Sequence, residues 1–328
     1  MQCIVCGSRD AKIIEVFPSG DFFKGFCYDF ALDNGLFRSI SESCEKQYKI
    51  NHCNSCGLEF AEPMKGGDSI FYDIIYTYMA KTGLRWEFDI FKADFNPPAK
   101  ILDIGCGDGS FVKFANKLGY QSKGIDFNPS RIDMAKDVDA EVENIDIKTI
   151  DHYLVSQKDT DIYTLWHVLE HLEDPLKTFS TLYSSAKKGS HIVLSIPSDR
   201  FYGTHRTPIQ TLNYPPHHLT RWTAPALRIL GEKSGWQLED FKYEPLNRAV
   251  STYGSRLIKS ILHHHNLFEE LYLFITKRKF SNKALSPVND KYKNTLFVKI
   301  AGRIAAKLML LEKNRLSNMS LYVKFKKG

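Results

Sequence analysis

The stretch that most constrains the fold of this chain is ILDIGCGDGSF, residues 101–111. An apolar run ends at Asp103, glycines follow at positions 105, 107 and 109, and an apolar-periodic segment then begins. This order predicts a buried strand, a tight turn and the start of a helix. Glycines in such a turn let the backbone approach a ligand, and the N–H groups of the helix start add partial positive charge. The sequence therefore predicts a turn that holds a ligand.

Strand and helix patterns alternate around this turn. Strands are expected at 100–105, 121–127, 140–144, 161–168, 191–197 and 236–244, and helices at 110–119, 128–138, 174–189 and 224–235. Asn128 and Pro129 suit a helix start, and Gly189 suits a helix end. Residues 320–327 alternate in polarity and are expected to form a last edge strand. Alternation over roughly 150 residues predicts an α/β fold with a doubly wound parallel sheet.

Composition and turn signals divide the chain into five segments. Residues 1–66 hold two CxxC pairs and end in a turn-rich boundary, so we expect a separate module there. Residues 67–98 carry aromatic residues at helical spacing and are predicted to be connecting helices. Residues 99–245 form the expected α/β core. Residues 246–316 break the alternation and are predicted to be a basic helical insertion before the last strand, residues 317–328.

The spacing of the glycines narrows the choice of ligand. From Asp103 to Gly109 the pattern is DxGxGxG, whereas a nicotinamide dinucleotide site requires GxGxxG. Asp126 ends the next expected strand, about twenty residues downstream, where a carboxylate can accept the ribose hydroxyls of an adenosine ligand. These features disfavour a nicotinamide-dependent dehydrogenase and favour another adenosine-containing ligand.

Four segments together resemble the class I S-adenosylmethionine-dependent methyltransferases. They are ILDIGCGDGSF, GIDFNPSRIDMA, DIYTLWHVLEHLEDP and HIVLSIPS, in the family's order, and they cover roughly residues 99–245. The resemblance implies a Rossmann-like sheet of seven strands and S-adenosylmethionine as cofactor. It also implies a set of cofactor-binding residues, namely Asp103, Gly105, Cys106, Gly107, Gly109, Asp126, Phe127, Asp146, Ile147, Leu165 and His167.

Two histidine-containing stretches are candidates for proton removal from a methyl acceptor. In WHVLEHLEDP, His167, Glu170 and His171 would share one face if the segment is helical. This place resembles a divalent-metal site of quinone-precursor methyltransferases, although His167 stands where those have a carboxylate. In NYPPHHLTRWT, His217 and His218 resemble the His–Glu pair of nucleotide-sugar C-methyltransferases. The predicted catalytic residues are therefore His218, His217, His171 and Glu170.

The cysteines predict a metal site in the N-terminal module. Cys3 and Cys6 form one CxxC pair, Cys53 and Cys56 form the other, and a glycine follows each pair. Four thiolates satisfy a structural tetrahedral zinc, and paired CxxC in a reducing compartment indicates metal binding in preference to a disulfide. A four-cysteine module before a methyltransferase core is also similar to the sugar C-methyltransferases.

Charge is concentrated near the C-terminus. Residues 251–328 hold 16 Lys and Arg against 4 Asp and Glu, within a chain whose net charge is +6. Residues 294–314 have an apolar face and a basic stripe, which favours either helix packing or a peripheral contact with anionic lipid. The start of the chain lacks a signal-peptide pattern and no spanning segment is found, so a cytoplasmic protein is expected, in part at the inner face of a membrane.

These observations predict an S-adenosylmethionine-dependent methyltransferase that acts on a small molecule. A nucleotide-linked sugar, or a surface-polysaccharide or lipid-linked intermediate, is the first expectation for the acceptor. The alternative is an O-methyltransferase acting on a quinone-type or other hydroxyl acceptor. A zinc-ribbon adaptor with a degenerate methyltransferase core is the alternative from another class. Nucleic acid is not expected as a partner, because the basic residues lie far from the cysteines and lack interleaved aromatics.

Overall fold

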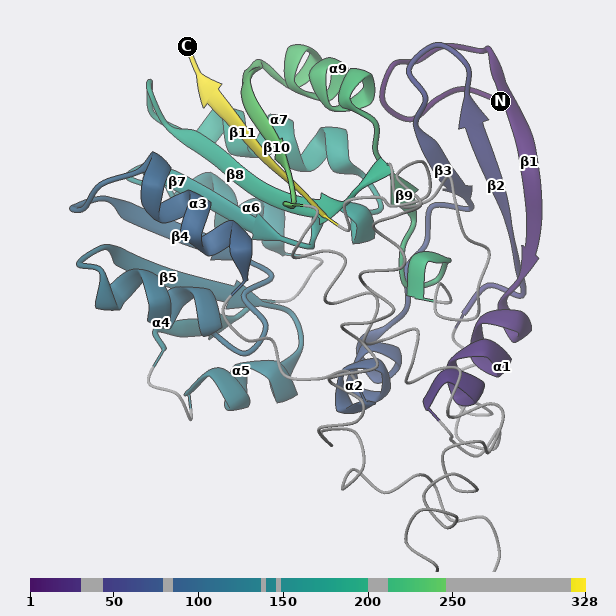
Figure 1. The fold of residues 1–328 in the computed structure, drawn as a ribbon, viewed down its shortest axis with the longest axis horizontal. Helices are drawn as coiled ribbons and strands as arrows, with labels where there is room; N and C mark the ends of the chain where they lie inside the picture. Colours follow the sequence, from purple (N-terminus) through teal and green to yellow (C-terminus); the bar gives the residue numbers. More distant parts are fainter. Residues whose placement is uncertain (31–43, 79–84, 137–139, 146–148, 200–211, 246–319) are drawn as a thin grey trace, which may run out of the picture.

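A computed structural model describes residues 1–30, 44–78, 85–136, 140–145, 149–199, 212–245 and 320–328 (Figure 1). Two sheets organise these residues, one of seven strands and one of four. The predicted insertion, 246–316, lies outside the described residues.

The larger sheet has the strand order β10-β11-β8-β7-β4-β5-β6. The five strands from β8 to β6 are parallel, and β11 runs antiparallel to both of its neighbours. This arrangement confirms the predicted seven-stranded α/β sheet. The strands are β4 (Lys100–Ile104), β5 (Gln121–Asp126), β6 (Val142–Asn144), β7 (Ile162–Trp166), β8 (His191–Pro197), β10 (Trp236–Tyr243) and β11 (Ser320–Lys327).

Helices cover both faces of this sheet (Figure 1). Neighbouring strand residues point to opposite faces, and the two core clusters separate accordingly. Ile101 and Ile162 pack with α3 and α4, whereas Leu102 and Tyr163 pack with α7 and α9. Burial on both faces explains why these strands are almost continuously apolar. The helices around the sheet are α3 (Trp86–Asp94), α4 (Ser110–Lys117), α5 (Pro129–Lys136), α6 (Ile150–Ser156), α7 (Pro175–Ser185) and α9 (Ala224–Ser234).

Local signals set most helix starts, but one expected helix end is wrong. The side chain of Asp174 accepts a hydrogen bond from the Lys177 N–H at 2.9 Å, with Pro175 in the first turn of α7. The same helix ends at Ser185, four residues before the expected Gly189. Gly189, at φ +80°, instead turns the chain into β8, and its N–H donates to the Lys327 carbonyl. A long-range pairing with β11 therefore replaces the expected helix cap.

The expectation that residues 320–327 form an edge strand is also wrong. β11 lies between β8 and β10, with Val323 opposite Leu194 on one side and Phe241 on the other. Its first four residues and Phe325 are all buried. The alternation of polar and apolar residues suggested that one face of this strand is exposed. In the structure, residues on both faces of the strand are buried. The edge position is taken by β10, which contacts α9.

The smaller sheet is antiparallel and has the order β1-β2-β3-β9. β9 comes from far along the chain and pairs with β3, so this sheet joins the N-terminal residues to the core. Two helices pack beside it through a cluster of phenylalanines and tyrosines, which contains Phe22, Phe26 and Phe71. The elements are β1 (Ala11–Pro18), β2 (Gln47–Cys53), β3 (Glu59–Glu62), β9 (Thr220–Arg221), α1 (Ser19–Phe30) and α2 (Ser69–Tyr78).

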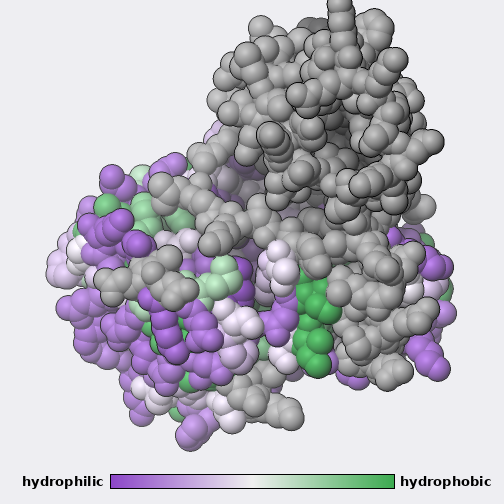
Figure 2. Space-filling model, turned by 90° about the horizontal axis from the view of Figure 1, so that it is seen from below, coloured by the Kyte–Doolittle hydropathy of each residue, from purple (hydrophilic) through white to green (hydrophobic). Residues whose placement is uncertain are grey.

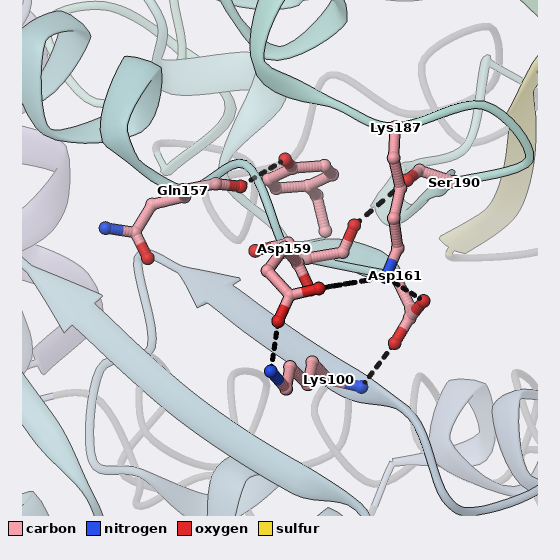
Figure 3. Close-up of polar contacts among 8 residues, drawn as sticks. Lys100, Gln157, Asp159, Asp161, Lys187 and Ser190 are labelled. Atoms are coloured by element: carbon pink, nitrogen blue, oxygen red, sulfur yellow. Dashed lines mark hydrogen bonds and ion pairs between the residues drawn. The ribbon is translucent and has the colours of Figure 1, made fainter.

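A group of ion pairs ties together the amino ends of the parallel strands (Figure 3). Asp161 accepts from the Lys100 backbone N–H at 2.8 Å and pairs with the Lys187 ammonium at 2.8 Å. Asp159 pairs with both Lys100 and Lys187. These residues lie at the start of β4 or shortly before β7 and β8, so they are at the sheet end opposite to the glycine turn. The cluster therefore ties together the loops at the amino end of the sheet.

The described surface is mostly hydrophilic on the face shown in Figure 2, with a small apolar area on the same face. Among the described residues, no helix combines the length and the apolar character needed to cross a bilayer.

Candidate functional site

The glycine turn connects β4 to α4 in a conformation that only glycine adopts easily. Gly105, Gly107 and Gly109 have φ values of +71°, +55° and +70°. The N–H groups of Gly105 and Cys106 donate to the Ile125 carbonyl, which holds the turn against β5. The turn lies at the carboxyl end of the parallel strands, where open α/β sheets bind their ligands.

Asp126 links the end of β5 to this turn. One carboxylate oxygen accepts from the Gly107 N–H at 2.9 Å, and the other accepts from the Asn128 N–H at 2.9 Å. Burial raises the pKa of Asp126, and the two backbone donors act in the opposite direction. Each oxygen keeps a further lone pair, so the carboxylate can accept two more hydrogen bonds from a ligand.

Asp103 is the buried acid beneath the turn. Its Oδ1 accepts from the Thr164 hydroxyl at 2.6 Å, while its Oδ2 is buried without a hydrogen-bond partner in the described structure. Burial raises the pKa of Asp103 to about 8, and nearby Asp126 acts in the same direction. An unpaired buried acid oxygen is costly, so this position is suited to a cationic or donor group of a ligand.

Helix α2 covers the same end of the sheet and links its parts. Asp73 accepts from the Asn128 side chain at 2.9 Å, and the Arg131 guanidinium stacks on the Tyr76 ring at 4.6 Å. Tyr72 contacts both Phe127 and His171, with ring centroids 5.5 Å and 5.9 Å away. The sequence predicts only a connecting helix here; the signal that points to a site is the run of tyrosines on one helix face.

His167 lies between two buried carboxylates. Its Nδ1 is 3.2 Å from Glu170 Oε1, and its Nε2 is 3.5 Å from Glu87 Oε1. Burial alone would lower the pKa of His167, but the two carboxylates raise it. Its φ of +57° is unusual for a non-glycine residue and directs the ring between the two acids. Glu87 is a site residue that the sequence analysis missed; its sign in the sequence is an acid between the aromatic residues Trp86 and Phe88.

The imidazole rings of His171, His217 and His218 form a cluster next to Tyr72. His171 lies in the single turn η2 (Leu169–His171), and His217 and His218 lie shortly before β9. The ring centroids are 4.5 to 4.7 Å apart. Burial lowers the pKa of all three histidines, so each ring is neutral at neutral pH. Only Leu169–His171 is helical in this segment, so Glu170 joins His167 while His171 faces the other histidines.

The four cysteines converge in the N-terminal module. The Sγ atoms of Cys3 and Cys56 are 3.7 Å apart, and those of Cys6 and Cys53 are 3.5 Å apart. Gly7 and Gly57, at φ +77° and +75°, close matching turns after each pair. The module contacts the core directly, because the Thr223 hydroxyl at the start of α9 donates to the Cys56 carbonyl at 2.6 Å.

Comparison with known proteins identifies the central part of the chain. Residues 78–240 match a family model described as a methyltransferase domain. This region is a methyltransferase domain. The match agrees with the sheet order and with the turn between β4 and α4, and it confirms the predicted enzyme class. It spans the glycine turn, Asp126, His167 and the three-histidine cluster, so the methyltransferase domain contains all predicted site residues outside the cysteine module.

Curated relatives of the methyltransferase domain match over a shorter stretch. A ubiquinone biosynthesis O-methyltransferase from Vibrio vulnificus is 28% identical over 116 residues, which is 34% of this chain and 49% of the relative. A similar protein from Xanthomonas campestris is 29% identical over 103 residues. The chain thus spans about half the length of the curated relatives it matches.

The chain is also similar, at low identity, to several solved structures. A SAM-dependent methyltransferase from Archaeoglobus fulgidus is 20% identical, with a TM-score of 0.45, over 78% of this chain and 100% of its own. Phosphoethanolamine N-methyltransferase 2 from Haemonchus contortus, in complex with S-adenosyl-L-methionine, is 16% identical, also with a TM-score of 0.45. That match covers 75% of this chain and 53% of the other chain.

The methyltransferase domain places some predicted cofactor residues away from the surface of the turn. The Cys106 side chain is buried with Val112 and Ile132, which leaves its backbone on the turn. Leu165 is fully buried in the main core between the sheet and α7. Asp146 and Ile147 lie outside the described residues, just after β6. Gly105, Gly107, Gly109 and Asp126 do come together, as the sequence predicts.

Proposed function

We propose that the chain transfers a methyl group from S-adenosylmethionine to a small-molecule acceptor. The observation that carries this proposal is Asp126, which is fixed by the Gly107 and Asn128 N–H groups at the mouth of the glycine turn. In this position its free lone pairs would accept the two ribose hydroxyls of the donor. Asp103 Oδ2, which has no partner in the described structure, would accept from the donor's ammonium group.

The donor supplies the methyl group on a sulfonium, and the protein has to align and shield the reactants. Helix α2 carries out the shielding, because Tyr72 and Tyr76 lie over Phe127 and Arg131. Buried Glu87 and Glu170 add negative charge beside the end of β7, which favours a cationic donor there.

Proton removal from the acceptor, where it is needed, would fall to the acceptor side of the site. His171, His217 and His218 are neutral and carry lone pairs, as general bases require. Glu170 would act beside them by holding His167 at the end of β7. Tyr72 contacts both Phe127 and His171, so we expect the acceptor to bind near Tyr72, between the histidines and the donor.

The acceptor that we favour is a nucleotide-linked sugar or a surface-polysaccharide intermediate. The support is the four-cysteine module, which is part of the small sheet that reaches the core through β9. A quinone-type hydroxyl is the second candidate, supported by the match to enzymes named ubiquinone biosynthesis O-methyltransferases. Incubation with isotope-labelled donor and each acceptor class, followed by mass spectrometry, distinguishes the two by which product gains the labelled methyl group.

The donor assignment is tested by calorimetry with S-adenosylhomocysteine. We expect Asp126→Asn to bind about 10- to 100-fold more weakly than the unaltered chain, because it loses charge-assisted hydrogen bonds. Asp133→Asn is the matched control, since Asp133 is an exposed acid on the adjacent helix α5. Equal affinities in the two variants would contradict the assignment. No binding by the unaltered chain would favour the adaptor alternative.

We further propose that the four cysteines hold a structural zinc. Tetrahedral zinc with Zn–S bonds near 2.3 Å places sulfurs about 3.8 Å apart, and the observed separations of 3.7 and 3.5 Å fit this requirement. We expect zinc that resists dialysis and is released when a mercurial reagent modifies the thiols. A folded protein that has no zinc and four freely titrating thiols in these pairs would overturn the proposal.

A further inference from the structure

The three-histidine cluster has a hydrogen-bonding arrangement that its role as a base does not explain. Nδ1 of His171 donates to the His217 carbonyl at 2.5 Å, and Nδ1 of His217 donates to the Leu212 carbonyl at 2.8 Å. A carbonyl oxygen only accepts, so both rings carry their proton on Nδ1. Each Nε2 therefore presents a lone pair. A backbone carbonyl that fixes the ring in this way is the usual outer partner of a metal-ligating histidine.

His218 supplies a second and independent observation. Its side chain is nine-tenths buried, and its Nδ1 has no hydrogen-bond partner in the described structure. The nearest polar rings are His171 and His217, which already use their Nδ1 protons elsewhere. A buried ring nitrogen without a partner is costly, and a bound ligand would satisfy it.

The ligand atoms are close enough to share one ion. One ring nitrogen from each of the three histidines lies within 4.8 Å of the other two. Metal–nitrogen bonds near 2.1 Å require nitrogens about 3.4 Å apart in a tetrahedral site, so small side-chain rotations would close the cluster. Three neutral imidazoles suit zinc and related divalent transition metals and do not suit magnesium or calcium.

We propose that His171, His217 and His218 bind a divalent transition-metal ion and leave a fourth coordination position for a further ligand. This site is separate from the four cysteines, which form their own group. Metal binding by the three histidines does not rest on the proposed function, but the role of the bound metal in catalysis does. The fourth position would take an acceptor hydroxyl oxygen as a ligand and lower its pKa, so that its proton is released to solvent before the methyl group is transferred. The cluster would then act by coordination and not by accepting the proton on a ring nitrogen.

Cobalt titration of the whole chain, prepared with one equivalent of zinc on the four cysteines and none on the histidines, tests the site. Cobalt bound by imidazoles absorbs in the visible without the near-ultraviolet thiolate charge-transfer band, so the two sites give different spectra. We expect one further equivalent of cobalt with the imidazole spectrum. In His218→Ala and His171→Gln its affinity should fall by at least about tenfold. His152→Asn, an exposed histidine on α6, should bind cobalt like the unaltered chain.

Folding of each variant is checked by circular dichroism and by calorimetry with S-adenosylhomocysteine. His171 is only partly buried, so His171→Gln keeps the test valid if His218→Ala does not fold. The proposal is overturned if the folded, unaltered chain takes up no further cobalt with this spectrum. It is also overturned if His171→Gln and His152→Asn bind cobalt equally well. Loss of S-adenosylhomocysteine binding alone would count against the donor proposal and not against the metal site.

Discussion

At the scale of single residues, burial determines both the hydrogen bonding and the protonation state of Asp103. Its carboxyl group is buried, has one partner in Thr164 and has a pKa raised to about 8 by burial. In the folded protein without ligand, Asp103 is therefore mostly protonated at neutral pH, whereas an unfolded aspartate is ionised above about pH 4. The folded state binds the extra proton between these two values, so this group's contribution to stability is lost as the pH rises through about 8.

Ligand binding should reverse this protonation. The donor's ammonium group, placed on Asp103 Oδ2, favours the carboxylate and lowers the pKa of Asp103. We expect binding of S-adenosylhomocysteine at pH 7 to release a proton from Asp103. Calorimetry in buffers with different ionisation enthalpies measures the release.

Asp103→Asn isolates the proton that comes from this residue. The variant should release less proton on binding, and its free energy of unfolding should fall less steeply between about pH 5 and 8 than that of the unaltered chain. Equal proton release by both proteins would mean that the ammonium group does not contact Asp103.

At the scale of elements, the β4–α4 turn shows how backbone geometry and packing act together. A Cβ on Gly105 would lie 2.6 Å from Val168 Cγ2, in addition to the strain of φ +71°. Gly189 has a similar φ of +80° but no atom within 4 Å of such a Cβ. An alanine at position 189 would therefore introduce backbone strain alone, whereas an alanine at position 105 would introduce strain and steric overlap.

We expect Gly189→Ala to lower the free energy of unfolding by about 1 kcal/mol, from strain alone. Gly105→Ala should cost about 1 to 3 kcal/mol more, because Val168 at the end of β7 has to move. It should also weaken S-adenosylhomocysteine binding, which Gly189→Ala should leave unchanged. Chemical denaturation and calorimetry measure the two effects. Similar losses of stability in both variants would show that the contact with Val168 is relieved without cost.

At the scale of the whole molecule, the two ends of the sheet have different tasks. The carboxyl end gathers the glycine turn, Asp126 and the histidines. The amino end holds the ion pairs that Lys100 and Lys187 form with Asp159 and Asp161 (Figure 3). The ion pairs are largely exposed, so each contributes little to stability and is screened by salt.

Lys187→Met should therefore lower the free energy of unfolding by less than about 1 kcal/mol, and the difference should shrink at high salt. S-adenosylhomocysteine affinity should not change, because the substitution is at the opposite end of the sheet. Denaturant unfolding at low and high salt, with calorimetry alongside, provides the measurement. A marked loss of affinity would show that the two ends are coupled.

The sequence by itself determined the parts that local physics encodes. Apolar periodicity defined the strands and helices of the core, the glycine spacing defined the turn, and Asp126 followed from its place at the end of the next strand. The CxxC pairs likewise predicted the cysteine cluster that the structure contains. These signals depend on residues close in sequence, where backbone preference and side-chain period act directly.

Only the tertiary structure decided which distant side chains meet. It placed Glu87 beside His167, separated His171 from His167, and joined His171 to His217 and His218 across 46 residues of chain. It also moved β11 into the sheet interior and paired β9 with β3. The reason is that such contacts depend on how whole elements pack, and packing is set by the summed burial of many side chains, which no local pattern contains.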